Sequence, residues 1–116
     1  MESLTPRYTS HPSNRLKLEC SVDTVAVVLR VHGEIDLETT PAFDAEILRI
    51  IEAQPERVLI DLSGVEFIDS TGLSALIRAD QGAAANGQQL SLRGGSSQVR
   101  RLFELTGLLD RLNFED

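Results

Sequence analysis

Apolar and polar residues alternate near the beginning of the chain and predict its first two strands. Leu16, Leu18 and Cys20 alternate with polar residues, which is the two-residue period of a strand with one solvated face. Residues 25–31 are almost continuously apolar and rich in β-branched side chains, as in a strand that is covered on both faces. A turn around residues 22–24 would join the two strands, so we expect an antiparallel hairpin with residues 16–20 at the sheet edge.

Further along, the apolar spacing changes to the period of a helix. Thr40 and Pro41 are typical of a helix start, as an N-cap hydroxyl followed by proline at the first helical position. The apolar stripe that follows consists of Phe43, Ile47, Ile50 and Ile51, and Pro55 ends the helix. The remaining predicted elements are a strand over residues 58–62, a helix from residues 69–72 to Gly87, a strand over residues 90–92, a helix from Ser96 to Gly107, and a short tail turn over residues 108–114.

The order of these elements predicts an α/β fold. Strands that are separated by a helix in one sheet lie parallel, with right-handed crossovers. We therefore expect a small mixed, mostly parallel four-stranded sheet with helices packed against it. Residues 1–14 have no periodic apolar face, so we expect a disordered N-terminal extension before one folded domain over residues 15–116.

The predicted topology also brings two connections together. In a parallel sheet, the connections that follow residues 25–31 and 58–62 leave the same edge, so Asp36 is expected near Asp69 and Ser70. This carboxyl edge is where open α/β sheets usually bind ligands and partners.

The composition narrows the classes of function. The 116 residues carry 11 Lys+Arg and 18 Asp+Glu, and the formal net charge of −7 would repel a nucleic-acid backbone, so we expect no nucleic-acid partner. Cys20 is the one cysteine; it cannot form an internal disulfide or a multi-cysteine zinc site, and it suits a small core residue. The N-terminal stretch contains no apolar run typical of a signal peptide or membrane anchor, so we expect a cytoplasmic protein with no membrane partner.

Residues 69–72, Asp-Ser-Thr-Gly, form the densest group of polar side chains on a predicted helix start. Asp, Ser and Thr are the preferred N-cap residues, and such a cap contributes about 1 kcal/mol without any further function. A hydroxyl at a helix N-terminus also suits phosphorylation, because the terminus accommodates an anion while the added charge changes what the surface binds. The spacing alone leaves capping and a phosphorylation switch at Ser70 as alternatives of about equal weight.

Catalytic functions find less support in the sequence. Ser70 lacks the surrounding G-x-S-x-G of a nucleophile elbow, and His32 has no assigned role as a base, which argues against a hydrolase. Residues 69–72 resemble the Asp-Ser/Thr-Gly triplet of aspartic proteases only superficially, because an additional residue intervenes and helical patterning replaces an all-β chain. We therefore do not expect an enzyme.

Ligand-binding patterns are also indistinct. Residues 94–97, Gly-Gly-Ser-Ser, could offer backbone N–H groups to a phosphate but are more typical of a strand-to-helix turn. Glu34, Asp36 and Asp69 could hold a divalent cation if they converged, but surface acids are the more common case in an acidic protein. We expect neither a metal nor another cofactor.

Three stretches of sequence stand together in a characteristic order. They are Gly-Glu-Ile-Asp at residues 33–36, Val-Leu-Ile-Asp-Leu-Ser-Gly-Val-Glu-Phe-Ile-Asp-Ser-Thr-Gly-Leu at residues 58–73, and Val-Arg-Arg-Leu-Phe-Glu-Leu-Thr-Gly-Leu at residues 99–108. Together they resemble the STAS family, the sulfate transporter and anti-sigma-factor antagonist domain, and within it the stand-alone bacterial anti-sigma-factor antagonists.

This resemblance implies a regulatory binding module with a STAS-like fold. In that family, the antagonist binds an anti-sigma factor, which is a serine kinase, and a sigma factor is thereby released. The kinase uses ATP to phosphorylate the hydroxyl residue directly after the motif aspartate, and a phosphatase later restores the antagonist. By this match, Ser70 is the phosphate acceptor, in preference to Thr71.

The match also implies a partner-binding surface, made up of Asp36, Asp69, Ser70, Thr71, Gly72 and Leu73. Asp36 would lie near the acceptor, and the helix that opens at Thr71 would supply contacts to the kinase. Some relatives of the same fold are instead constitutive adaptor subunits of transporters or stress-sensing complexes and make no use of the acceptor. This adaptor function is the alternative that the resemblance leaves open.

Overall fold

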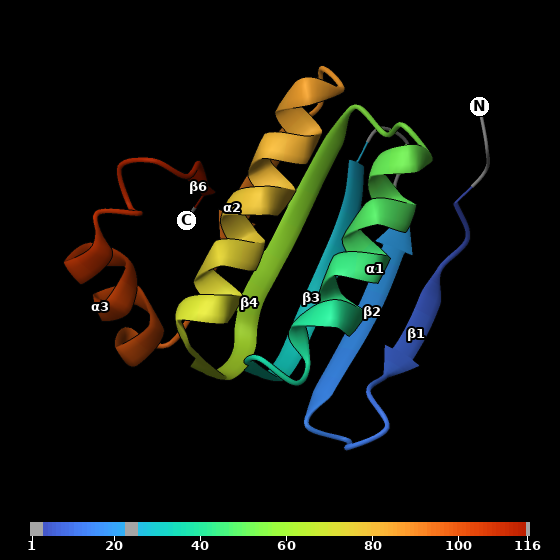
Figure 1. Cartoon of the computed structure of the whole chain (residues 1–116). Helices are drawn as coiled ribbons and strands as arrows, with labels where there is room; N and C mark the ends of the chain where they lie inside the picture. Colours follow the sequence, from blue (N-terminus) through green and yellow to red (C-terminus); the bar gives the residue numbers. More distant parts are fainter. Residues whose placement is uncertain (1–3, 23–25, 116) are drawn as a thin grey trace.

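The computed structural model describes residues 4–22 and 26–115, which form one mixed sheet and three helices (Figure 1). The elements are, in chain order, β1 (Arg7–Ser10), β2 (Leu16–Val22), β3 (Ala26–Ile35), α1 (Thr40–Glu52), β4 (Arg57–Ile68), α2 (Ser70–Ala85), β5 (Gln89–Arg93), α3 (Ser97–Thr106) and β6 (Phe114–Glu115). The predicted α/β class is confirmed, but the described residues form six strands rather than the expected four.

The strands lie in the sheet in the same order as in the sequence. β1 and β3 both pair antiparallel with β2, which confirms the predicted hairpin but places residues 16–20 inside the sheet rather than at its edge. β3, β4, β5 and β6 run parallel. The turn expected around residues 22–24 falls mostly outside the described residues. Because β3 and β4 are parallel neighbours, both end at the lower edge of the sheet in Figure 1.

α1 and α2 lie side by side on one face of the sheet and bury its apolar side chains (Figure 1). On β2, the predicted alternation is confirmed, since Leu16, Leu18 and Cys20 are each at most 3% exposed. α3 contacts β4 and buries Phe103, whose ring meets that of Phe114 edge to face. Among the described residues, no helix has both the length and the apolar character needed to cross a membrane.

Residues 7–10 correct the prediction of a disordered segment over residues 1–14. They form the edge strand β1, in which Arg7 pairs with Cys20 and Ser10 with Lys17. Arg7 also reaches the buried carboxylate of Glu46 on α1, with 3.5 Å between Nε and Oε1. Backbone hydrogen bonds and this ion pair hold the strand, so it needs no periodic apolar face. The sheet therefore extends across the domain boundary predicted at residue 15, with β1 on one side of it and β2 on the other.

Two further boundaries differ from the sequence prediction. The N-cap of α1 is Thr39 rather than Thr40, and the Thr40 hydroxyl donates to the C=O of Asp36 over 2.5 Å instead of accepting a capping bond. β4 continues to Ile68 rather than ending at Leu62, because its pairing with β3 shifts register near His32 and Gly33 and then resumes. The extended strand delivers Asp69 directly to the start of α2.

Candidate functional site

The connections that follow β3 and β4 meet at the carboxyl edge of the sheet. Ile35 and Ile68 are register partners at the ends of these strands. The N–H of Asp69 donates to the C=O of Ile35 over 3.3 Å, so the two connections are joined one residue before Asp36. The expected closeness of Asp36 and Asp69 is therefore confirmed.

Ser70 is the first residue of α2 and is exposed. The N-cap is Asp69, whose Oδ1 accepts the N–H of Gly72 over 3.0 Å. The Ser70 hydroxyl makes no side-chain hydrogen bond within residues 4–22 and 26–115. The cap, which was one of the two alternatives for Ser70, is thus provided by Asp69, and the Ser70 hydroxyl is exposed.

The remaining residues of the predicted surface are less accessible. Thr71 is partly buried. Gly72 is buried, and a Cβ atom there would lie 2.6 Å from the C=O oxygen of Ile35 and 2.6 Å from Cγ1 of Ile68. Leu73 is 6% exposed and belongs to the core. Gly72 and the Leu73 side chain thus lie on the packed side of α2, and their contacts with a partner stay a prediction.

Asp36 is held by several hydrogen bonds. Its Oδ1 accepts the N–H groups of Glu38 and Thr39, each over 3.1 Å, and its Oδ2 binds Nη1 of Arg15 over 2.6 Å. The Arg15 hydrogen bond lowers the pKa of Asp36 to about 2. Asp36 thus fixes the β3–α1 connection, and its side chain is only 17% exposed.

Arg15 was not predicted as part of the site. Besides Asp36, it binds Oε1 of Glu34 over 3.0 Å and Oε1 of Glu38 over 3.1 Å, although these acids lie about twenty residues away in the sequence. No local pattern of residues marks such a pair. Glu34 and Asp36, which were weighed as ligands of a divalent cation, are thus paired with a side chain of the protein itself.

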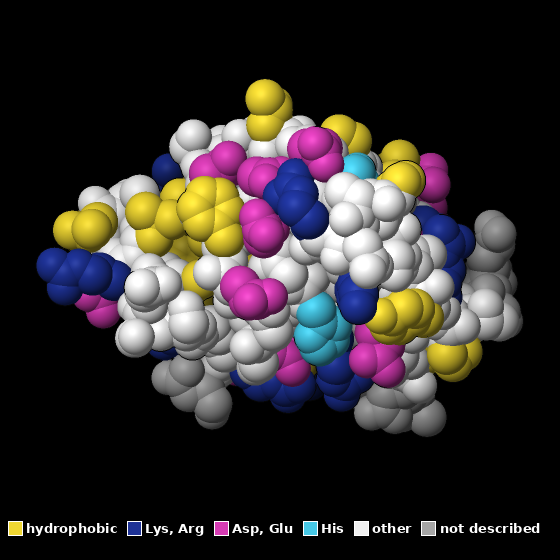
Figure 2. Space-filling view, turned by 90° about the horizontal axis from the view of Figure 1, so that it is seen from below, with side chains coloured by type: hydrophobic (Ala, Val, Ile, Leu, Met, Phe, Trp, Pro, Cys, Tyr) yellow, Lys and Arg dark blue, Asp and Glu magenta, His cyan; other side chains and the backbone are white. Residues whose placement is uncertain are grey.

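The surface around this ion-pair group is predominantly acidic. Figure 2 views this edge from below and shows acidic side chains gathered around a basic one, with apolar side chains beside them. We call the five carboxylates on and beside the two connections the acidic edge; they are Glu34, Asp36, Glu38, Glu66 and Asp69. Arg15 offsets part of this charge, and the edge as a whole keeps a negative net charge.

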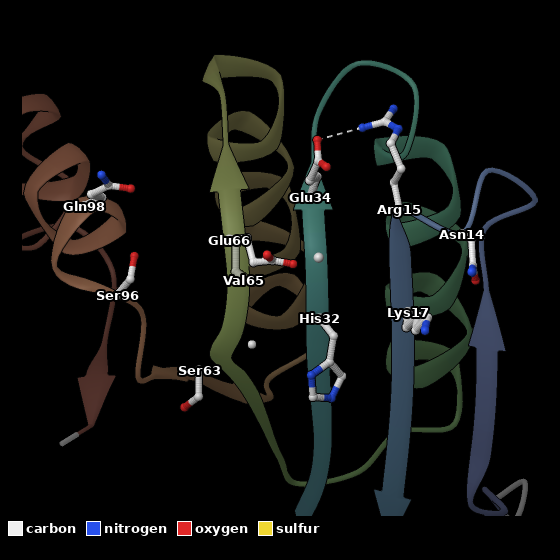
Figure 3. Close-up of a pocket in the computed structure, with 12 residues that line it drawn as sticks. Asn14, Arg15, Lys17, His32, Glu34, Ser63, Val65, Glu66, Ser96 and Gln98 are labelled. Carbon is white, nitrogen blue, oxygen red and sulfur yellow. Dashed lines mark hydrogen bonds and ion pairs between the residues drawn. The ribbon is translucent and has the colours of Figure 1, made fainter.

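The sheet face that α1 and α2 leave uncovered carries a hollow of about 780 Å³ next to the acidic edge (Figure 3). Lys17 and His32, which are register partners on β2 and β3, project from this face, and Glu34 and Glu66 line the end nearer the edge. Ser70 is not among the residues that line the hollow with His32.

Two other candidate ligand sites have structural explanations. The glycines at residues 94 and 95 adopt positive φ angles of 79° and 102°, and Ser96 caps α3 by accepting the N–H of Val99 over 3.2 Å. This confirms a strand-to-helix turn.

In the part of the chain that the structure describes, no group of three or more His, Cys, Asp or Glu side chains is placed to hold a metal ion.

Comparison of the sequence with models of known protein families identifies the family of this chain. The family model described as the STAS domain matches residues 17–116. The chain belongs to the STAS domain family. The resemblance found in the sequence motifs is thereby confirmed.

Relatives within this family are similar over most of their length. The anti-sigma-B factor antagonist of Staphylococcus aureus is 27% identical over 101 residues, which cover 87% of this chain and 94% of the relative. The crystal structure of an anti-sigma factor antagonist from Mycobacterium paratuberculosis has a TM-score of 0.80 at 28% identity, with 91% of this chain and 89% of the other covered. The Bacillus cell fate determinant SpoIIAA in its phosphorylated form shares the fold, with a TM-score of 0.65, 22% identity, and 87% and 91% of the two chains covered.

Proposed function

We propose that this protein is an anti-sigma-factor antagonist. In its unmodified form it binds an anti-sigma factor serine kinase through the carboxyl edge of the sheet and so frees a sigma factor. Phosphorylation of Ser70 ends the interaction, and a phosphatase restores it. The observation that carries this proposal is the exposed Ser70 hydroxyl at the N-terminus of α2, which the Asp69 cap leaves uncommitted.

The proposed modification is a phosphoryl transfer from ATP. A bond forms between Ser70 Oγ and the γ-phosphorus, the bond from that phosphorus to the β–γ bridging oxygen breaks, ADP leaves, and the hydroxyl proton is released. The product carries about −1.5 to −2 charges at a helix N-terminus, where free N–H groups and the helix dipole favour an anion. The scaffold therefore tolerates the modification, and hydrolysis by the phosphatase reverses it.

The choice of Ser70 over Thr71 is supported by accessibility. A kinase needs the hydroxyl oxygen in line with the γ-phosphate, which requires that it project from the surface. Ser70 is exposed, whereas Thr71 is partly buried.

The names of the relatives support the regulatory role. Both the Staphylococcus aureus relative and the Mycobacterium paratuberculosis structure are anti-sigma factor antagonists by name, and they match nearly the whole chain. The fold itself also accommodates a phosphorylated state, since SpoIIAA was solved in that form.

The test is phosphoryl transfer and binding with the purified anti-sigma factor kinases encoded in the same genome. We expect one kinase to bind the wild type and to transfer radiolabelled phosphate from ATP to Ser70, located by mass spectrometry of the peptide. Ser70→Ala should bind this kinase without accepting label, and Thr71→Ala, the matched control, should still accept it. Ser70→Asp should bind about tenfold more weakly or worse.

Three results would contradict the proposal in different ways. Absence of binding to every kinase excludes the antagonist role. Label retained in Ser70→Ala places the acceptor elsewhere. Equal binding of the wild type and Ser70→Asp indicates the alternative, a constitutive adaptor that makes no use of Ser70.

A further inference from the structure

Two large apolar side chains are exposed close to Ser70. Leu37, in the β3–α1 connection, is 75% exposed, and Phe67, near the end of β4, is 49% exposed. A hydrogen bond between Asp69 N–H and Ile35 C=O joins these two segments. Ile35 is two residues from Leu37, and Asp69 is two residues from Phe67. Two residues of chain span about 7 Å at most, so the backbones of Leu37 and Phe67 both lie near the point where the connections meet.

This pair differs from the other exposed apolar residues. Among the described residues, the large exposed ones are Tyr8, Val22, Leu37, Leu48, Phe67 and Leu105. Single apolar side chains on a surface are ordinary and need no explanation. Leu37 and Phe67, however, come from two separate segments that the fold brings to the same edge, next to the proposed phosphate acceptor.

The charge of the edge raises a question about the proposed switch. The five carboxylates of the acidic edge favour a partner with a basic surface. By Coulomb attraction alone, a phosphate on Ser70 would make the surface more negative and would strengthen binding to such a partner. Loss of binding on phosphorylation therefore requires that the partner atoms that face Ser70 in the complex disfavour a negative charge.

An apolar contact resolves this question. A phosphate that is covered by apolar atoms loses its hydration without gaining hydrogen-bond partners, which is strongly unfavourable. We propose that Leu37 and Phe67 are the apolar anchors of the kinase-docking surface, and that they insert into an apolar recess of the anti-sigma factor kinase bordered by basic residues. Phosphorylation of Ser70 then blocks binding because the contact that these anchors make must be dry.

The two parts of this surface have separate tasks. Leu37 and Phe67 supply most of the affinity, as buried apolar and aromatic anchors do at protein interfaces. The acidic edge around them steers a basic partner and speeds association, and this contribution decreases with salt. The inference rests on the proposed function, because it takes the Ser70 kinase as the partner.

The first test measures the affinity of the kinase for surface variants. Leu37→Ser and Phe67→Ser are each expected to weaken binding about tenfold or more. Leu105→Ser and Leu48→Ser are matched controls, since these side chains are 72% and 58% exposed and lie on α3 and α1 away from the two connections; each should change affinity less than about twofold. Thermal unfolding of each variant verifies that Phe67→Ser remains folded at the temperature of the assay.

The second test separates a dry contact from charge repulsion. In wild type, the loss of affinity caused by Ser70→Asp should persist at about 0.5 M salt, where exposed charges are screened within a few ångströms. In the double variant Leu37→Ser/Phe67→Ser, the additional loss from Ser70→Asp should be smaller than in wild type, because the contact that excludes water is gone.

Each outcome bears on one of the two proposals. If Leu37→Ser and Phe67→Ser bind like their controls while Ser70→Asp still fails to bind, the apolar anchors are excluded and the phosphorylation switch stands. If the Ser70→Asp loss disappears at high salt, repulsion is the cause and the dry contact is excluded. If Ser70→Asp binds like wild type, the proposed function fails, whatever the anchor variants do.

Discussion

The two connections at the carboxyl edge begin alike and serve different purposes. Each has an isoleucine at the end of its strand followed by an aspartate: Ile35 and Asp36 after β3, Ile68 and Asp69 after β4. Asp36 is locked by Arg15 and by the N–H groups that it accepts, so it builds a rigid connection. Asp69 needs only one capping bond, and the residue after it remains exposed. A connection fixed by hydrogen bonds thus lies beside one whose first helical residue is exposed.

The largest expected effect comes from breaking the close approach between the two connections. Gly72→Ala places a Cβ against the backbone oxygen of Ile35 and should lower the free energy of unfolding by about 2 kcal/mol. Gly82→Ala is the matched control on the same helix, because its Cβ would meet only the flexible end of Ile51, at 3.3 Å. We expect Gly82→Ala to be neutral or to stabilise by up to about 1 kcal/mol, since alanine favours a helix. Urea unfolding measures both; equal effects would contradict the close approach.

A smaller change in the free energy of unfolding should follow from loss of the hydrogen bonds that hold the Asp36 carboxylate, and this change should depend on pH. The pKa of Asp36 is about 2 in the folded protein and about 3.9 in an unfolded chain, so the ionised form stabilises the fold at pH values above the unfolded pKa. This stabilisation should be lost as the pH falls from about 4 to about 2. The stability difference between wild type and Asp36→Asn should therefore be largest near neutral pH and should shrink over this range.

The ion pair between Arg15 and Asp36 can also be tested by changing Arg15. Arg15→Gln removes the hydrogen bond that lowers the pKa of Asp36, so an NMR titration of the Asp36 carboxyl should move upward, toward about 3.9. An unchanged titration would mean that the Thr39 and Glu38 N–H groups hold the carboxylate without Arg15.

The smallest effects should come from the two neighbours at the start of α2. Asp69→Ala removes the cap and should cost about 1 kcal/mol, whereas Ser70→Ala should cost close to nothing. Ser96→Ala, which removes the corresponding cap of α3, is a positive control and should also cost about 1 kcal/mol. If urea unfolding shows a larger loss of stability for Ser70→Ala than for Asp69→Ala, the assignment of the cap to Asp69 is contradicted.

Periodicity predicted the elements that are held by apolar burial. β2, α1, α2 and α3 all bury the stripes that the sequence displays, and the hairpin and parallel order followed from them. The edge strands β1 and β6 were missed because they have only four and two residues, which is too short to display an apolar period.

The site was predicted where chain topology decides and missed where side-chain direction decides. Parallel pairing of β3 and β4 was enough to bring Asp36 close to Asp69. The inward direction of Leu73 depends on the rotation of α2 against the sheet, which motif membership does not specify. The role of Arg15 depends on long-range pairing with acids at the end of β3 and in the connection that follows it, and no short sequence window contains both partners.

The burial of Cys20 makes position 70 unusually convenient for labelling. The sequence has one cysteine, which is 1% exposed, and burial raises the pKa of its thiol, so alkylating reagents reach it poorly. A Ser70→Cys variant would therefore offer a selectively reactive thiol, at a helix start whose cap belongs to Asp69. A fluorophore attached there would report the arrival and departure of a protein at this edge in real time.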